Sequence, residues 1–231
     1  MKRYIYKQLL AWKNEKEHKP LILNGARQVG KTYILREFGR NEYKRMAFFS
    51  LDRDQKALEI FNKGGRATDM LMALSAICHE DITPHDTLVV LDEIQNCPKA
   101  LEALKFFCEE TPEIDIVVAG SLLGLSIHSG VSYPVGKVEE LHLYPMTFLE
   151  FLEAMGKTQL VNLLENKNWT VINMLETELI SSLRQYYYVG GMPAAVLAHI
   201  EKKGWKEVRR IQQQIITDYR RDFSKHAPTR E

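Results

Sequence analysis

The feature that most constrains the fold of this chain is the segment at residues 25–32, which reads GARQVGKT. Apolar residues 20–24 precede it and predict a strand, whereas residues 33–38 follow it and predict a helix that Gly39 would end. A glycine-rich turn of this spacing points successive backbone N–H groups, together with a helix N-terminus, at one place. Such a turn, a P-loop, binds the phosphates of a nucleoside triphosphate.

Every residue of this segment is therefore a candidate for nucleotide binding. Lys31 would reach the β and γ phosphates with its ammonium group, and the hydroxyl of Thr32 would ligate magnesium. We accordingly expect ATP and Mg²⁺ as ligands. The alternative is an ordinary strand-to-helix turn that binds nothing. The candidate residues are Gly25, Ala26, Arg27, Gln28, Val29, Gly30, Lys31 and Thr32.

A second motif follows at residues 86–93, where the run DTLVVLDE ends in two carboxylates. The run predicts a buried parallel strand, and the carboxyl ends of such strands face the ligand. Adjacent strand residues point to opposite sides, so Asp92 and Glu93 have different expected roles. We assign Asp92 to the magnesium site beside Thr32, and Glu93 to positioning and polarising the attacking water as a general base. A solvated acidic strand end is the alternative.

A third candidate strand, residues 114–119, is followed by Gly120 and Ser121. In ATPases that carry an acidic pair, a polar residue at the end of the next strand commonly contacts the γ-phosphate or the attacking water. Ser121 is therefore a candidate catalytic residue. A hydroxyl that only caps a local turn explains it equally well.

Five segments occur in an order that resembles a known family. They read NGARQVGKT at residues 24–32, LDEIQ at 91–95, AGS at 119–121, LYPMTFLEF at 143–151 and GGMP at 190–193. The order is similar to that of prokaryotic AAA-superfamily ATPases in which an ATPase core precedes a helical and winged-helix region, often followed by a nuclease-like C-terminal domain. The resemblance covers nearly the whole chain. It implies ATP hydrolysis, and it implies that the strand before Ser121 lies between the strand of Asp92 and the strand before the P-loop.

Two departures from that family bear on function. Where the family has Gly-Arg before its next strand, this chain has Gly136 and Lys137. Lysine keeps the charge that would stabilise a transition state but lacks the planar fork of arginine. Lys137 is thus a candidate catalytic residue, and the alternative is that it merely begins the fifth strand in solvent. Family members also continue well past the point that corresponds to Glu231 here. We therefore expect a truncated chain that lacks a C-terminal effector domain.

The remaining pattern predicts an α/β fold, in which helices sandwich the parallel sheet of a P-loop NTPase, followed by a smaller all-helical region. Thr147, with Glu150 three residues on, predicts a capping box. We therefore divide the chain into an ATPase core, residues 1–146, and a helical lid or second domain, residues 147–231. Other helices are expected at 2–17, 69–78 and 98–110, other strands at 43–51 and 138–143, and a Gly-, Ser- and Pro-rich loop at 122–138.

Composition excludes several classes of function. The 231 residues include 31 Lys and Arg against 30 Asp and Glu, so no global field recruits nucleic acid or a membrane. The start of the chain lacks the apolar stretch of a signal peptide, and no later run approaches a membrane span. Cys78, Cys97 and Cys108 have no metal or redox spacing, and the seven histidines lack an HExxH pattern. We expect a cytoplasmic protein without a zinc site.

The C-terminal tail is locally basic. Residues 201–231 hold nine Lys or Arg against five Asp or Glu, on a helix with a broad apolar stripe. The tail is interpreted as a solvated helix face or, alternatively, as a surface for DNA, RNA or the missing C-terminal region. Tyr186, Tyr187 and Tyr188 are interpreted as core packing, with base stacking as the alternative.

The leading hypothesis is an ATPase whose nucleotide state moves the helical region and so acts on an effector or a nucleic acid. A nucleotide-gated switch, which would hold ATP or ADP with little hydrolysis, is one alternative, and Lys137 in place of arginine favours it. A small-molecule kinase would also use a P-loop. The adjacent Asp92 and Glu93 argue against a kinase, because a phosphoryl acceptor would compete with the activated water. The oligomeric state is left open.

Overall fold

The computed structural model describes residues 1–121 and 133–226, with side chains as far as Phe223. Contacts divide the chain into two compact units. The sheet unit comprises Ile5–Ala26 and Gly30–Leu143, and the helical unit comprises Met1–Tyr4, Arg27–Val29 and Tyr144–Glu231. The division after Leu143 thus falls three residues before the boundary expected at residue 147. Two short segments of the N-terminal half also group with the helical unit, which the sequence did not suggest.

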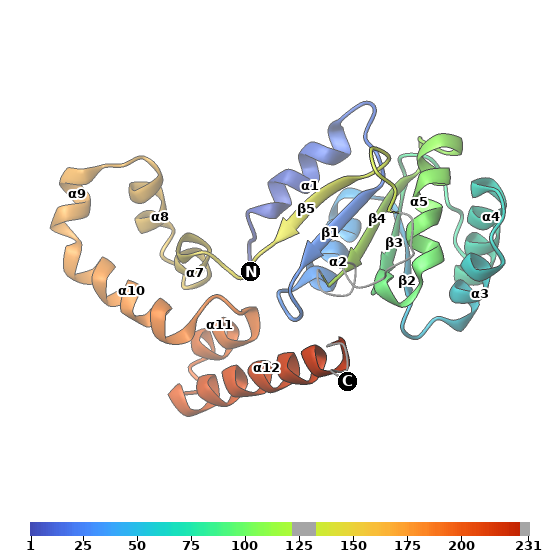
Figure 1. Ribbon diagram of the computed structural model, residues 1–231. Helices are drawn as coiled ribbons and strands as arrows, with labels where there is room; N and C mark the ends of the chain where they lie inside the picture. Colours follow the sequence, from blue (N-terminus) through green and yellow to red (C-terminus); the bar gives the residue numbers. More distant parts are fainter. Residues whose placement is uncertain (122–132, 227–231) are drawn as a thin grey trace. The chain divides into compact units, whose positions relative to one another are not determined.

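Five parallel strands form the sheet in the order β2-β3-β4-β1-β5 (Figure 1). β1, β3 and β4 are buried along their whole length, because each is a short apolar run covered on both faces. β4 lies between β3 and β1, which confirms the strand order that the family resemblance implied. The strands are β1 Leu21–Gly25, β2 Arg45–Ser50, β3 Thr87–Asp92, β4 Asp115–Gly120 and β5 Glu139–Leu143.

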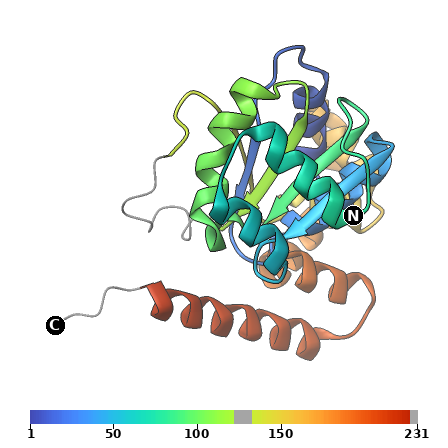
Figure 2. The same ribbon diagram turned by 90° about the vertical axis from the view of Figure 1, so that its right-hand side faces the viewer.

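Helices cover both faces of this sheet, which confirms the expected α/β class. α3, α4 and α5 pack on one face of the sheet (Figure 2). Phe61 and Phe107 meet edge to face in this layer, which covers alternate residues of the strands. α1 and α2 contribute Trp12 and Phe38 to the other buried side chains of the unit. The helices are α1 Ile5–Asn14, α2 Lys31–Glu42, α3 Gln55–Lys63, α4 Ala67–Cys78 and α5 Pro98–Glu110, with a 3₁₀ turn, η1, at Ile94–Asn96.

One expectation about these helices was wrong, and one helix was missed. α2 does not end at Gly39 but continues to Glu42, because Gly39 serves close packing: a Cβ there would lie 2.5 Å from the sulfur of Met46 on β2. α3 was not expected at all. The expected loop at 122–138 lies mostly outside the described residues, which resume at Tyr133.

A buried ion pair joins the segment before β1 to the first residue of β4. His18 Nε2 lies 2.7 Å from Asp115 Oδ1, and both side chains are nearly inaccessible to solvent. This hydrogen bond raises the pKa of His18, and burial opposes the rise only in part. Folding at this edge therefore depends on the charge of one histidine.

Six helices lie in the described part of the helical unit, and the first of them begins with the capping box predicted at Thr147 and Glu150. Position 191 in the GGMP segment requires glycine, because a Cβ there would lie 2.3 Å from the carbonyl oxygen of Met146. None of the helices in the described part of the chain is long and apolar enough to cross a membrane. The helices are α7 Phe148–Ala154, α8 Thr158–Glu165, α9 Trp169–Met174, α10 Glu176–Val189, α11 Pro193–Ile200 and α12 Trp205–His226.

Candidate nucleotide site

The P-loop connects the end of β1 to the start of α2, as its sequence predicts. Gln28 and Gly30 have positive φ angles of 62° and 98°, which turn the chain sharply back towards the helix. Gly30 is the N-cap of α2 and has no side chain to accept from the N–H groups of the first helical turn, as Ser or Asp would. A bound anion is the natural partner for these N–H groups.

Lys31 holds its ammonium group over the same loop. Its Nζ donates to the carbonyl oxygens of Gly25, at 2.8 Å, and Ala26, at 3.0 Å. Both bonds are local, so phosphate oxygens arriving in the loop can replace them without unfolding the helix. This position agrees with the expected contact between Lys31 and the β and γ phosphates, which stays a prediction.

The structure brings Thr32 and Asp92 together from positions 60 residues apart. The hydroxyl of Thr32, in the first turn of α2, donates a 2.6 Å hydrogen bond to Asp92 Oδ2 at the end of β3. Asp92 is only 4% exposed, and its other carboxylate oxygen accepts from the backbone N–H of Glu93 at 3.0 Å. Hydroxyl and carboxylate oxygens are the hard donors that magnesium prefers.

No cluster of three or more His, Cys, Asp or Glu side chains that could hold a metal occurs among the described residues. A magnesium ion beside Thr32 and Asp92 would thus take its remaining ligands from phosphates and water. That division is usual for magnesium, which retains several waters and is bound by one or two carboxylates plus substrate phosphates. The donor set therefore fits Mg²⁺ in company with a nucleotide.

Glu93 is fixed at the carboxyl edge of the sheet by its backbone and by Gln95. Its φ and ψ of 57° and 44° lie in the left-handed region, which is uncommon for a residue with a side chain. Residues held in such conformations tend to cluster at active sites. Gln95 Nε2 donates to Glu93 Oε2, and Gln95 Oε1 accepts from the backbone N–H of Ser121 at 3.4 Å. Gln95 therefore connects the ends of β3 and β4.

Sequence reasoning quoted Gln95 as part of a family segment but gave it no role. The signal that pointed to it was the triplet Glu93-Ile94-Gln95, in which Gln95 follows the strand end by three residues. The catalytic role of Ser121 stays a prediction. Its backbone N–H contacts Gln95, and the pairing of β4 with β1 places Ser121 near the end of β1.

Lys137 does not lie with these groups. It immediately precedes β5, whose first residue, Glu139, pairs in register with Leu21 at the amino end of β1. β1 spans five residues, or roughly 15 Å, before it reaches the loop at the opposite edge. Lys137 Nζ instead lies 2.9 Å from Glu109 Oε1 in the last turn of α5, and this contact raises the pKa of Lys137. The placement favours the alternative that Lys137 begins the fifth strand in solvent.

Side chains at the tip of the loop contact α12 within the helical unit. Arg27 Nη1 lies 2.6 Å from Asp222 Oδ1, and Gln28 Nε2 donates to Asp218 Oδ2 at 2.9 Å. The hydroxyl of Tyr219 donates to the carbonyl oxygen of Arg27 at 2.6 Å. These side chains face α12, so the loop tip would contribute backbone N–H groups to phosphate binding. Sequence reasoning missed these contacts because they join residues about 190 positions apart.

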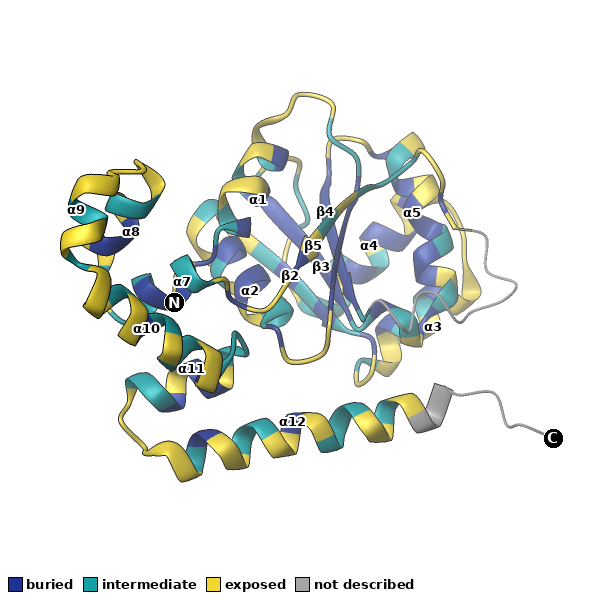
Figure 3. Cartoon of the chain, turned by 60° about the vertical axis from the view of Figure 1, so that its left-hand side comes forward, coloured by how far each residue is buried: buried dark blue, intermediate teal, exposed yellow. Residues whose placement is uncertain are grey.

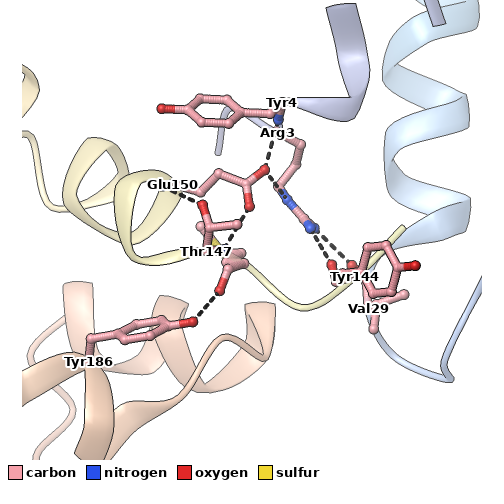
Figure 4. A network of polar contacts seen from close by, with 8 residues as sticks. Arg3, Tyr4, Val29, Tyr144, Thr147, Glu150 and Tyr186 are labelled. Carbon is pink, nitrogen blue, oxygen red and sulfur yellow. Dashed lines mark hydrogen bonds and ion pairs between the residues drawn. The ribbon is translucent and has the colours of Figure 1, made fainter. Parts of the chain in front are cut away.

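A buried network around Arg3 also reaches the loop tip (Figure 4). The Arg3 guanidinium donates to Glu150 Oε1 at 3.1 Å, to the carbonyl oxygen of Val29 at 3.0 Å and to the carbonyl oxygen of Tyr144. Glu150 accepts in addition from the backbone N–H of Thr147, which completes the capping box of α7. One arginine thus joins the N-terminus, the loop tip and the first helix of the helical unit.

Comparisons with known proteins agree with this geometry. Residues 17–152 match the family described as AAA domain, and residues 180–231 match a domain of unknown function. No curated protein sequence gives a significant match. The Walker-type ATPase PABY2304 of Pyrococcus abyssi is similar in structure at 16% identity, with a TM-score of 0.59 over 98% of this chain and 76% of that one. Drosophila ORC bound to DNA is similar at 15% identity, with a TM-score of 0.52 over 91% of this chain and 65% of that one. At these identities the likeness establishes the fold.

Proposed function

Since this chain belongs to the AAA-domain family, we propose that it binds ATP with magnesium and hydrolyses it to ADP and phosphate. The observation that carries the proposal is the 2.6 Å hydrogen bond between Thr32 and Asp92. The two alternatives for these motifs, a turn that binds nothing and a solvated acidic strand end, do not require the hydroxyl of Thr32 and the carboxylate of Asp92 to be in contact. A shared magnesium site does require this contact.

Binding rests on the P-loop backbone, on Lys31 and on the oxygen pair of Thr32 and Asp92. Magnesium, when bound, supplies charge that neutralises phosphate oxygens as the γ-phosphate departs. The protein's part is positioning: the N–H groups of the first turn of α2 orient the phosphates, and Lys31 places a mobile positive charge among them.

Hydrolysis rests on Glu93. Its carboxylate would accept a proton from a water that attacks the γ-phosphate in line with the leaving ADP, and Gln95 would hold that carboxylate in one orientation. A positioned general base contributes roughly 10²- to 10⁴-fold in rate. Ser121 directly follows β4, and its backbone N–H donates to Gln95. Its side chain would contact the same phosphate or water.

The test is single-turnover phosphate release by purified protein with ATP and magnesium. Glu93→Gln should bind ATP as tightly as the parent and release phosphate at least 10²-fold more slowly, because the amide keeps the shape and loses the basicity. Asp92→Asn should lose the dependence of ATP binding on magnesium. Glu59→Gln, which removes an exposed carboxylate from α3, is the matched control and should leave both properties unchanged. Identical behaviour of the Asp92 and Glu93 variants would contradict the assigned roles.

The position of Lys137 favours a second candidate, a switch that holds ATP with little hydrolysis. The cation expected to stabilise the transition state lies at the opposite edge of the sheet from the P-loop. Acceptor-independent phosphate release at many turnovers per hour would exclude the switch, and acceptor-dependent release would indicate a kinase.

We further propose that the nucleotide state is transmitted to the helical unit and through it to a nucleic acid. Two contacts support transmission: Arg27 pairs with Asp222 on α12, and Arg3 holds the carbonyl oxygen of Val29. The description of the similar Drosophila structure, ORC bound to DNA, suggests nucleic acid as the effector class. An ATP-dependent change in the affinity of the protein for an oligonucleotide would test this proposal.

A further inference from the structure

An open groove of about 760 Å³ lies in the helical unit between α10 and the start of α12. Its volume falls within the range of roughly 300–1,000 Å³ that small-molecule sites occupy. The side chains that form it combine aromatic surface with hydrogen-bonding groups. They include Ile180, Ser181, Arg184, Gln185, Tyr188 and Trp205.

The aromatic wall of this groove is exposed and yet held in place. Trp205 is 48% exposed and Tyr188 is 41% exposed, and their ring centroids lie 4.7 Å apart. Trp205 stacks against the imidazole of His199 at 5.0 Å, and His199 stacks in turn on Phe151, which is fully buried. Large aromatic side chains exposed in a fixed orientation are typical of binding surfaces, because little conformational entropy is lost when a ligand stacks on them.

Positive charge surrounds the aromatic wall. Arg184 lines the groove, and the guanidinium carbon of Arg209 lies 5.3 Å from the centre of the Tyr188 ring. Exposed residues recur along α12 (Figure 3), and the basic ones among them are Lys206, Arg209, Arg210, Arg220 and Arg221.

The acidic residues of α12 cancel only part of this charge. Asp218 and Asp222 contact Gln28 and Arg27 at the loop tip, on the less exposed side of the helix. Glu207 pairs with Arg210 at 2.7 Å. Among the described residues that line the groove, Glu176 is acidic, and its carboxylate is suited to accept from an amino group of a base. The exposed face of α12 therefore attracts an anionic ligand.

We propose that the groove and the exposed face of α12 bind single-stranded nucleic acid, with a base stacked on Trp205 and Tyr188 and phosphates beside Lys206 and Arg209. The alternation of flat apolar rings and cations matches the alternation of bases and phosphates along such a strand. A duplex would keep its bases stacked on one another and would leave the aromatic wall uncovered. This inference rests on the proposed function in one respect, the choice of nucleic acid as the effector. Binding in the groove does not require ATP hydrolysis.

The first test measures fluorescence anisotropy of a labelled oligodeoxythymidine of about 20 nucleotides, longer than the roughly 4–16 nucleotides of common single-strand sites. Loss of one base stack is worth roughly 1–3 kcal/mol, so Trp205→Leu should weaken binding on the order of tenfold or more. Trp205→Phe, which keeps an aromatic face, should stay within about threefold of the parent. Equal affinities for both variants and the parent would overturn the proposal, as would failure of the parent to bind.

The second test separates phosphate contacts from stacking. Lys206→Gln and Arg209→Gln should each reduce the slope of log affinity against log salt by about 0.7, the value for one phosphate contact on a single strand. Arg53→Gln, which removes an exposed charge from the sheet unit, is the control and should leave the slope unchanged. Equal binding to a duplex of mixed sequence would refute the preference for single strands, and polyglutamate that competes as well as the oligonucleotide would show an acidic protein partner instead.

One variant distinguishes failure of the ATPase proposal from failure of the nucleic-acid proposal. Lys31→Ala should abolish ATP binding and leave oligonucleotide binding without nucleotide unchanged. If that variant loses both, the groove is not an independent site and the inference is wrong.

Discussion

Replacing Arg3 with methionine removes the guanidinium from the network in Figure 4 while keeping a long apolar stem. Arg3 has only 6% of its side chain exposed, so solvent does not screen its contacts. The charged hydrogen bond to Glu150 is worth roughly 1.5–3 kcal/mol, and those to the carbonyl oxygens of Val29 and Tyr144 are worth about 1 kcal/mol each. The free energy of unfolding should therefore fall by about 3.5–5 kcal/mol.

The lower end of this range is expected, because Glu150 would not be left alone. It still accepts from the backbone N–H groups of Tyr4, at 2.7 Å, and Thr147, at 2.8 Å. Urea denaturation followed by circular dichroism measures the loss. Arg3→Lys is the matched control: it keeps the charge but lacks the fork that reaches three acceptors, so it should recover about half of the lost stability.

A double-mutant cycle with Glu150→Gln isolates the pair itself. Residues that share a buried network should show a coupling free energy of about 1–3 kcal/mol. The reasoning would be refuted if Arg3→Met unfolded at the urea concentration of the parent, or if the two single effects added to within about 0.5 kcal/mol.

Three further predictions concern single groups. Lys31→Ala should abolish binding of a fluorescent ATP analogue while shifting the urea midpoint little, since the ammonium group of Lys31 donates to loop carbonyl oxygens and is not part of the apolar core; unchanged affinity would contradict its role. Lys137→Ala and Lys137→Arg should both match the parent rate of steady-state phosphate release, because the lysine pairs with Glu109 far from the P-loop, and a gain for arginine would restore its catalytic role. The raised pKa of His18 means that its contribution is complete below its ordinary pKa of about 6.5 and is lost as pH rises through the raised value. The parent should therefore lose stability to urea between pH 6 and pH 8, and His18→Gln should show a smaller loss.

The P-loop and the acidic strand were accessible from sequence because each depends on short-range spacing and on motifs of fixed length. The strand order came only from the family resemblance. Pro98–Glu110 was predicted to the residue, since proline begins it and three apolar positions repeat at helical spacing. α3 was missed because it buries only Ala57 and Phe61, too few positions to reveal a period. Gly39 was predicted to end its helix because glycine is a weak helix former. Its presence inside α2 is explained by the close approach of Met46, a long-range contact that local sequence does not reveal.

The site was predictable in its residues and less so in its contacts. Thr32 and Asp92 meet as their motifs imply. Sequence alone left open whether Lys137 is catalytic or begins the fifth strand in solvent, because the register of β5 on β1, which puts it at the amino edge, is a property of the assembled sheet. The same holds for Gln95, whose bridge between β3 and β4 requires both strands to be in position.

The contacts of Arg27 and Gln28 with α12 have a consequence for experiments that dissect the protein. A fragment ending at Leu143 would contain every residue of the GARQVGKT segment and the whole sheet, and it would look like a minimal ATPase. It would nevertheless lack Asp218, Tyr219 and Asp222, which hold the side chains and one carbonyl oxygen of the loop tip. Nucleotide affinity measured on such a fragment would describe a loop released from its last helix, and a substitution near residue 220 would mimic a P-loop defect without touching nucleotide.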